Sequence, residues 1–549
     1  MSTLSDLLRA FLDEQYADSP VHASGLGLTQ FDDQLDDMSE AAFELRASDT
    51  RRWLEAFEAV PAEGLDLADG IDRDLVLSQL RGRAITDEWE EWRRQPDVYL
   101  NPGLSGVFGL FLNALRPEEE LVSAAASRLR QVPNNLDDAR HNLRPELVPA
   151  LLLDRAVNQA RAGARYAREL LPAQVSQQLQ PQLAEAGAIA ADAYEAYATF
   201  LEDELRPKAS GEWVFGEERY SGILREREML DFDARGLRDR GQAEYDRLDA
   251  ELRRCAQEIS QTDDWHAVLL QLNEDRPQTP EDMRVGYEDW TIRARDFLAE
   301  RGLVTLPPGE ACSVEPSPHF QRPVLAVASY SAPPAFSDSM QGHFFVPFPP
   351  DGATEEEIGK RLESNCYAGI PTTSVHEAYP GHHWHLATMK LNGREVRQVL
   401  RTPYFTEGWA LYAERMMREQ GFFTDPRQEM FQYEATIFRA ARIVVDTSLH
   451  MGEMSWDDAV RYMVEHSALT EPTARAEVTR YCSWPTQASS YLTGSMEIAR
   501  IRDAFLAARG ASLTDASALR DFHDAIASSG GLPIALAERA AMPPSRGSR

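Results

Sequence analysis

The sequence is poor in cysteine and contains no long apolar run. Its four cysteines lie far apart without a CxxC pair: Cys255, Cys312, Cys366 and Cys482. This distribution argues against disulfides or a thiolate metal site and favours reduced thiols in a cytoplasm. No run of about 18 uncharged apolar residues suggests a membrane span, and the acidic, amphipathic first 14 residues do not resemble a signal peptide. We therefore expect a cytoplasmic protein.

Basic residues are also scarce. The 56 lysines and arginines face 89 acids, giving a formal net charge of -33. Such a charge repels phosphate backbones and anionic lipid surfaces, so we expect no nucleic-acid and no membrane partner. The proportions of 43% hydrophobic and 26% charged residues are typical of a globular protein. Because 549 residues exceed what one core usually serves, two lobes are expected, and a homodimer is left open.

Strand signals are nearly absent before about residue 300. Apolar residues recur at three- and four-residue steps, as in Leu4, Leu7 and Leu8, which predicts successive helices. Proline and glycine predict breaks at 96–109 and 133–135. Two later runs, 323–330 and 342–347, predict strands of one small sheet. The second run could offer its edge to an extended peptide, or be an ordinary edge strand.

The predicted fold is therefore mainly α-helical. We expect residues 1–300 to form a helical N-terminal lobe and residues 301–549 to form the region that carries the functional site, as one continuous unit. No low-complexity linker separates the two parts.

The most informative stretch is 376–382, HEAYPGH, followed at 406–414 by TEGWALYAE. A His-Glu pair, a second histidine and a downstream glutamate are the residue types that hold zinc in metallopeptidases. Residues six apart on a regular helix, such as His376 and His382, point about 120° apart. Pro380 and Gly381 permit a break that brings His382 round. The alternative is a helix end with clustered surface histidines.

His383 returns to the face of His376, but about 10.5 Å along the axis is too far for two imidazoles to share one ion. Farther along, Glu414 follows Glu407 by two helical turns and is nearly aligned with it. One of these carboxylates can bind metal while the other fixes an imidazole through its free ring nitrogen.

The runs HEAYPGHH and EGWALYAE, then Arg480-Tyr481 with Pro485, Gln487, Tyr491 and Gly494, closely resemble the bacterial proteins of domain-of-unknown-function family 885. That family resembles, more distantly, carboxypeptidase Taq and the thimet and neurolysin oligopeptidases. The match covers roughly the last 230 residues.

The resemblance implies a bilobal, zincin-like helical fold with a small sheet beside the metal helix and a deep central cleft. It implies that His376, His382 and Glu407 are zinc ligands and that Glu377 is the general base. Tyr491 matches a tyrosine that stabilises the tetrahedral intermediate across the cleft, and Gly494 would allow close helix packing.

Other residues either support the ligands or contact substrate: Glu414, His383, Arg442, Asp446, His450, Arg480, Gln487 and Arg500. Arg442, Asp446 and His450 recur at four-residue steps on one helix face, which fits either a structural ladder or a network that supports the site. Pro485 is expected to start a helix that carries Gln487 and Tyr491.

The function predicted from these residues is zinc-dependent hydrolysis of short peptides or small amides, with water activated at Glu377. Action as a carboxypeptidase would need a cation for the terminal carboxylate, and the candidates are Arg439, Arg442, Arg480 and Arg500. The alternatives are hydrolysis of an ester or a non-peptide amide, and a non-catalytic binding protein that keeps the fold. A general base serves no purpose in a purely structural zinc site, which disfavours the last alternative.

Overall fold

The computed structural model describes residues 3–318, 322, 327–350 and 352–542. Helices make up 70% of it, and one three-stranded sheet accompanies them. The prediction of a mainly α-helical fold is confirmed. None of the helices in these ranges combines the length and the apolar composition needed to cross a membrane.

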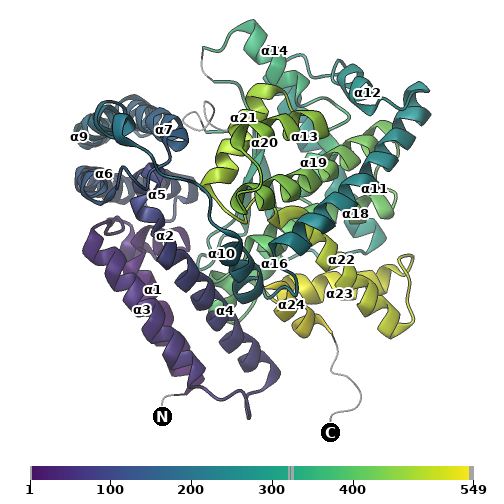
Figure 1. The fold of residues 1–549 in the computed structure, drawn as a ribbon, viewed down its shortest axis with the longest axis horizontal. Coiled ribbons are helices and arrows are strands. Elements are labelled where there is room, and N and C mark those ends of the chain that lie inside the picture. Colours follow the sequence, from purple (N-terminus) through teal and green to yellow (C-terminus); the bar gives the residue numbers. More distant parts are fainter. Residues whose placement is uncertain (1–2, 319–321, 323–326, 351, 543–549) are drawn as a thin grey trace.

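Helices α1 to α9 form the N-terminal part of the molecule, in purple and blue in Figure 1. Their bounds are α1 (Leu4–Asp18), α2 (Pro20–Gly25), α3 (Glu40–Glu58), α4 (Leu67–Trp89), α5 (Asn101–Asn113), α6 (Glu118–Asn142), α7 (Leu153–Arg165), α8 (Leu171–Ala173) and α9 (Gln180–Thr199). Short 3-10 turns lie at Thr29–Phe31, Glu91–Arg93, Pro96–Tyr99, Ala150–Leu152 and Arg206–Lys208, and π turns at Tyr166–Leu170, Phe200–Leu205 and Ile223–Arg227.

The break expected at 96–109 is right only in its first part, and the break expected at 133–135 is wrong, because two prolines are accommodated inside helices. The α-helix is interrupted between Trp89 and Asn101, but residues 101–109 belong to α5. Pro102 occupies the first turn of α5, where a missing N–H costs nothing. Pro133 lies inside α6, where Leu129, Val132 and Leu136 are buried in one apolar stripe. Burial of that stripe outweighs the cost of about 3 kcal/mol for an interior proline.

The remaining helices build the other side of the molecule. They are α10 (Glu217–Gly222), α11 (Ala234–Ser260), α12 (Trp265–Leu272), α13 (Pro280–Arg301), α14 (Glu355–Glu363), α15 (Ile370–Glu377), α16 (His382–Lys390), α17 (Glu395–Val399), α18 (Pro403–Glu419), α19 (Pro426–His450), α20 (Trp456–His466), α21 (Glu471–Ser483), α22 (Ser490–Arg509), α23 (Ala516–Ser528) and α24 (Ile534–Ala541).

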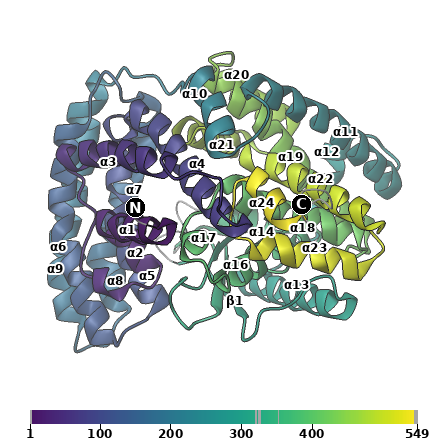
Figure 2. The same cartoon turned by 90° about the horizontal axis from the view of Figure 1, so that it is seen from below.

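The hydrophobic cores do not divide at residue 300. One core lies within the N-terminal part under α5, α6, α7 and α9, whereas the largest core joins residues of α4, such as Leu75, to residues of α18 and α23, such as Trp409 and Ile526. Polar contacts also cross this boundary, because Asp72 of α4 accepts hydrogen bonds from Arg394 and Arg397. Figure 2 shows α4 reaching from the N-terminal helices toward α24. The boundary at residue 300 stays a prediction.

The sheet has the order β1-β3-β2, with β1 (Ala311–Pro316) parallel and β2 (Ser329–Ser331) antiparallel to β3 (Gln341–Val346). The expected strand at 342–347 corresponds to β3. The expected strand at 323–330 contributes only its last two residues to β2, and its residues 323–326 lie outside the described ranges.

The strand β3 is not an edge strand. Its residues 343–345 pair with β2 on one side and with β1 on the other, so both expectations for an edge strand here are wrong. Phe344 and Val346 are fully buried, and Phe344 packs edge-on against Tyr287 of α13. The sheet therefore serves as a scaffold between α13 and the helices of the site.

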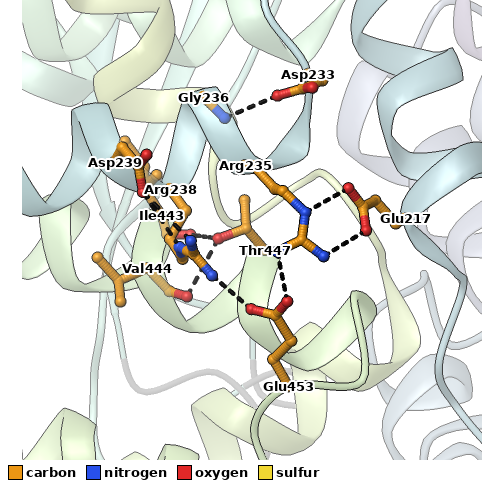
Figure 3. A network of polar contacts seen from close by, with 10 residues as sticks. All are labelled: Glu217, Asp233, Arg235, Gly236, Arg238, Asp239, Ile443, Val444, Thr447 and Glu453. Atoms are coloured by element: carbon orange, nitrogen blue, oxygen red, sulfur yellow. Dashed lines mark hydrogen bonds and ion pairs between the residues drawn. The ribbon is translucent and has the colours of Figure 1, made fainter.

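Helix α11 lies along α19 and is fastened to it by an arginine network at the surface (Figures 1 and 3). Arg235 donates to both carboxylate oxygens of Glu217 at 2.7 Å and to Glu453 at 2.7 Å. Arg238 donates to the other oxygen of Glu453 at 2.5 Å. The network joins α10, α11 and the end of α19, and so fixes the helix that carries Arg439 and Arg442.

Candidate metal centre

The helix that carries the motif is interrupted between its two histidines. Helix α15 ends at Glu377 and α16 begins at His382, with a cis Tyr379–Pro380 bond between them. The Gly381 amide donates to the Val375 carbonyl at 3.0 Å, and a side chain at Gly381 would collide with the carbonyl oxygens of Val375 and His376. The expected break at Pro380 and Gly381 is therefore confirmed.

Three side chains converge across this break. His376 of α15, His382 of α16 and Glu407 of α18 each offer one ligand atom, and these atoms all lie within 4.8 Å of one another. The Nε2 atoms of His376 and His382 lie 3.9 Å and 3.3 Å from Oε2 of Glu407. A tetrahedral zinc ion with bonds of about 2.1 Å holds its ligand atoms about 3.4 Å apart, so these separations suit one shared ion.

Glu414 orients one of these imidazoles. The Nδ1 atom of His376 lies 2.7 Å from Oε1 of Glu414, whose side chain is buried. A carboxylate can only accept, so Nδ1 carries the proton and the Nε2 lone pair is left for an ion. The structure thus places Glu414 where the sequence predicted it.

His383 points away from the centre. Its Nε2 lies 2.9 Å from Oε2 of Glu310 and its Nδ1 lies 2.9 Å from the Tyr330 hydroxyl. Tyr379 also donates to Glu310 Oε2, and Arg295 Nε donates to Oε1 at 2.8 Å. Burial opposes ionisation of Glu310, but these hydrogen bonds outweigh it and lower its pKa. No local sequence signal indicates this cluster, which fixes the first turn of α16 against β2.

Glu377 lies beside the ligands without being one of them. It is 8% exposed and does not share the cluster of ligand atoms. Burial raises its pKa, against the opposing influence of His376 and His382. At Glu407, burial is overcome by the hydrogen bond and charge of His382, which lower the pKa to about 2. Two carboxylates of one site are thus tuned in opposite directions, which suits a proton acceptor and a ligand.

Tyr491, on the first turn of α22, lies near enough to this centre for the charge of Glu407 to act on it. Gln487 Nε2 donates to its hydroxyl at 3.1 Å. Burial and the negative charge of Glu407 raise the pKa of Tyr491. The expected helix from Pro485 is wrong, because residues 484–489 form a turn in which Thr486 has a φ of 72°, and α22 begins at Ser490.

A pair of glycines brings the helices of Glu407 and Tyr491 together. A side chain at Gly494 of α22 would collide with the Tyr404 carbonyl and with Gly408 of α18. The expectation that Gly494 allows close packing is confirmed. Tyr491 lies one turn before Gly494 and Glu407 directly precedes Gly408, so both side chains are set by this crossing.

The predicted arginines differ in their partners. One oxygen of Glu477 accepts hydrogen bonds from Nη2 of Arg442 at 2.7 Å and from Nη2 of Arg480 at 3.0 Å. Arg480 also donates a hydrogen bond to the Gln487 side chain. Arg500 pairs with Glu497 and Glu538 at 2.7 Å each, at the surface. Arg500 is therefore engaged away from the ligand cluster, whereas Arg442 and Arg480 border Tyr491.

Asp446 and His450 belong to a buried polar network. Asp446 accepts a hydrogen bond from the Tyr220 hydroxyl at 2.6 Å. Ser489 Oγ contacts two hydroxyls, that of Tyr220 at 2.6 Å and that of Tyr404 at 3.1 Å. His450 accepts from the Phe215 amide at Nδ1, so its Nε2 donates to the Tyr481 carbonyl at 3.0 Å. The network joins α10, α18, α19 and the turn before α22, which favours the structural interpretation of this helix face.

Comparisons with known proteins agree with this architecture. Residues 20–540 match the family described as "Bacterial protein of unknown function (DUF885)". No curated protein matches the chain. A structure from Shewanella oneidensis, described as a "putative lipoprotein of unknown function", shares 20% identity at a TM-score of 0.78, covering 98% of this chain and 99% of that one.

A second structure, the "putative lipoprotein from Colwellia psychrerythraea", shares 19% identity at a TM-score of 0.78, again covering 98% of this chain and 99% of that one. Because both identities are below 25%, these likenesses concern the fold alone. The family match spans nearly the whole chain, beyond the last 230 residues on which the sequence resemblance rested. This chain belongs to the DUF885 family of bacterial proteins of unknown function.

Proposed function

We propose that the protein is a zinc-dependent hydrolase that cleaves amide bonds in short peptides. The observation that carries the proposal is the convergence of His376, His382 and Glu407, whose ligand atoms lie within 4.8 Å of one another, with Glu377 beside them. The finer fold assignment belongs to the same proposal: a two-lobed, zincin-like fold with the centre in a cleft.

The donor set fits zinc by its chemistry. Two imidazole nitrogens and one carboxylate oxygen are the ligands of open catalytic zinc sites, which keep a fourth position for water or substrate. The Glu414 carboxylate leaves Nε2 of His376 free of its proton, as a ligand must be. A bound zinc ion would supply Lewis acidity, which lowers the pKa of a coordinated water and polarises a carbonyl oxygen.

The residues of the chain would handle the protons and the developing charge. Glu377 accepts a proton from the attacking water and passes it to the leaving amine. The carbon–nitrogen bond of the amide breaks, the water oxygen joins the carbonyl carbon, and the products are a carboxylic acid and an amine. Tyr491 donates a hydrogen bond to the developing oxyanion, a contact typically worth about 2.7 to 4 kcal/mol. Burial of Glu377 and Tyr491 supports these roles. Where water is excluded, the electrostatic interactions of a carboxylate and a hydroxyl with a reacting group are stronger than in water.

The proposal is tested by metal analysis and by a peptide-library digest read by mass spectrometry. We expect one zinc ion per purified chain and cleavage of short peptides that is lost on chelation and in Glu377→Gln. Glu419→Gln is the matched control, because Glu419 lies in α18 but pairs with Arg415 and Arg502. Absence of zinc, or cleavage unaffected by Glu377→Gln, would contradict the proposal.

A further inference from the structure

Arg439 differs from the other arginines considered for a substrate carboxylate. Arg500 pairs with two acids, and Arg442 and Arg480 are both bonded to Glu477. Within the described ranges, Arg439 forms no ion pair. Its Nη1 donates to the Ala435 carbonyl at 2.9 Å, whereas its Nε is buried and has no partner.

The free part of Arg439 is the edge that binds carboxylates. Among the described residues neither Nε nor Nη2 of Arg439 makes a hydrogen bond, while Nη1 holds the guanidinium to its own helix. These two N–H groups form a planar fork that matches the two oxygens of a carboxylate. A buried donor without a partner costs free energy, so an occupant for this edge is expected.

Arg439 also lies near the metal centre. Its guanidinium carbon lies 5.9 Å from the ring centre of Tyr491. Its positive charge acts on both Glu377 and Glu407. Because consecutive Cα atoms are about 3.8 Å apart, a group held by Arg439 would lie within one or two residues of a carbonyl held at Tyr491.

Three arginines, Arg439, Arg442 and Arg480, gather near Tyr491, where the predicted ligand Glu407 supplies an opposing negative charge. The Arg442 guanidinium lies 5.0 Å from the Tyr491 ring centre, and Arg480 contacts the Gln487 side chain that bonds the Tyr491 hydroxyl. Glu477 balances one of these charges. The positive charge of Arg439 acts on Glu434, although the two form no ion pair. Burial raises the pKa of Glu434 to about 7, so this acid is only partly ionised near neutral pH. In a chain of net charge -33, such a group of three arginines beside one ring favours an anionic ligand.

We propose that Arg439 binds a free carboxylate of the substrate, so that the site acts on peptides or N-acyl amino acids whose carboxylate lies beside the scissile bond. The inference rests on the proposed function for the position of that bond. The carboxylate would occupy the Nε and Nη2 edge of Arg439, while the carbonyl lies between Tyr491 and the centre formed by His376, His382 and Glu407. The proposed substrates therefore carry a free carboxylate close to the scissile bond. Peptide bonds in the interior of long chains, which have no such carboxylate nearby, are not expected to be cleaved.

Arg401 is the competing cation. It directly precedes the N-cap of α18, is exposed, and within the described ranges makes no hydrogen bond or ion pair. Its charge acts on Glu407 and His382. Within the described ranges, however, the Arg401 guanidinium does not lie over the Tyr491 ring, and none of its nitrogens is a buried donor without a partner, as Nε of Arg439 is.

The test compares an N-acyl dipeptide that has a free carboxylate with the same compound as its carboxamide. Calorimetry with metal-free Glu377→Gln protein measures binding, and hydrolysis by the zinc-loaded wild type measures kcat/KM. We expect the acid to be preferred over the amide about 10- to 100-fold in both measurements, as charge-assisted hydrogen bonds imply. Arg439→Met should abolish the preference, Arg439→Lys should keep part of it, and Arg500→Met should leave it unchanged.

The two measurements separate this inference from the function it rests on. The protein could bind the acid preferentially, in a way that depends on Arg439, and yet hydrolyse neither compound. That outcome would contradict the proposed function and support the carboxylate site. Hydrolysis of both compounds at equal rates would overturn the carboxylate site alone. A preference lost in Arg401→Met but kept in Arg439→Met, or no binding of either compound, would also overturn the assignment. Circular dichroism confirms that each variant is folded.

Discussion

The imidazole of His376 donates a hydrogen bond of 2.7 Å to Glu414, which lies two turns after Glu407 on the same helix. One helix, α18, therefore supplies both a predicted ligand and the carboxylate that orients another predicted ligand. Any movement of α18 would change the direction of two ligand atoms together. The close contact between Gly408 and Gly494 opposes such movement.

Replacing Glu414 should weaken metal binding without removing a ligand. In Glu414→Gln the negative charge that holds the proton on Nδ1 of His376 is lost. The lone pair of Nε2 then becomes a weaker ligand for the metal ion. We expect the zinc dissociation constant to rise about 10- to 100-fold, measured by competition with a chelator. Glu419→Gln in the same helix is the control and should bind zinc as the wild type does. An unchanged affinity in Glu414→Gln would remove this role.

The neighbouring histidines His382 and His383 should separate cleanly. His382→Ala removes one of three ligand atoms and should lose the metal, as measured by elemental analysis. His383→Ala should retain it, because His383 is bonded to Glu310 and Tyr330. The second variant leaves Glu310 with one partner fewer in a buried site, which should cost about 1 to 3 kcal/mol and lower the midpoint of thermal unfolding. The reverse pattern of metal loss would refute the ligand set.

Glu377→Gln should separate catalysis from metal binding. The carboxylate lies outside the cluster of ligand atoms, so zinc content should not change. The variant lacks the proton acceptor, and kcat should fall about 10²- to 10⁴-fold with little change in KM. Stopped assays on a peptide found in the library digest measure both constants. Full activity in this variant would exclude Glu377 as the general base.

The site was predictable where its chemistry is local in sequence. The break at Pro380 and Gly381 and the two-turn interval between Glu407 and Glu414 both follow from helix geometry and residue type. The structure brings these groups together accordingly. The general helical character also follows from periodicity. In long amphipathic helices such as α11, this pattern can be read from the sequence without knowledge of the tertiary contacts.

The rest depends on contacts between distant parts of the chain. Glu310 and Tyr330 meet His383 across 73 and 53 residues, and no spacing rule relates such positions. The strand β1, with the sequence ACSVEP, lacks alternation and is a strand because it pairs with β3. Pro133 shows the same limit from the other side, since tertiary burial of α6 overrides a strong local preference.

A glycine at the crossing of α18 and α22 should be indispensable for stability, whereas another helical glycine should not. In Gly494→Ala the added methyl group meets the Tyr404 carbonyl and Gly408, both backbone atoms that cannot move alone, so the helices must separate. Overpacking of this kind costs about 1 to 3 kcal/mol. In Gly109→Ala of α5 nothing lies within 4 Å of the new methyl group, and the better helix former should stabilise by about 0.5 to 1 kcal/mol.

Urea denaturation of the two variants measures both effects. Because Tyr491 lies one turn before Gly494, separation of the helices also moves its hydroxyl away from Glu407. Hydrolysis by Gly494→Ala should therefore fall more steeply than its zinc content, which depends on α15, α16 and α18. Equal stability of the two variants would mean that the crossing yields to a methyl group, and the tight contact could then not be what sets the position of Tyr491.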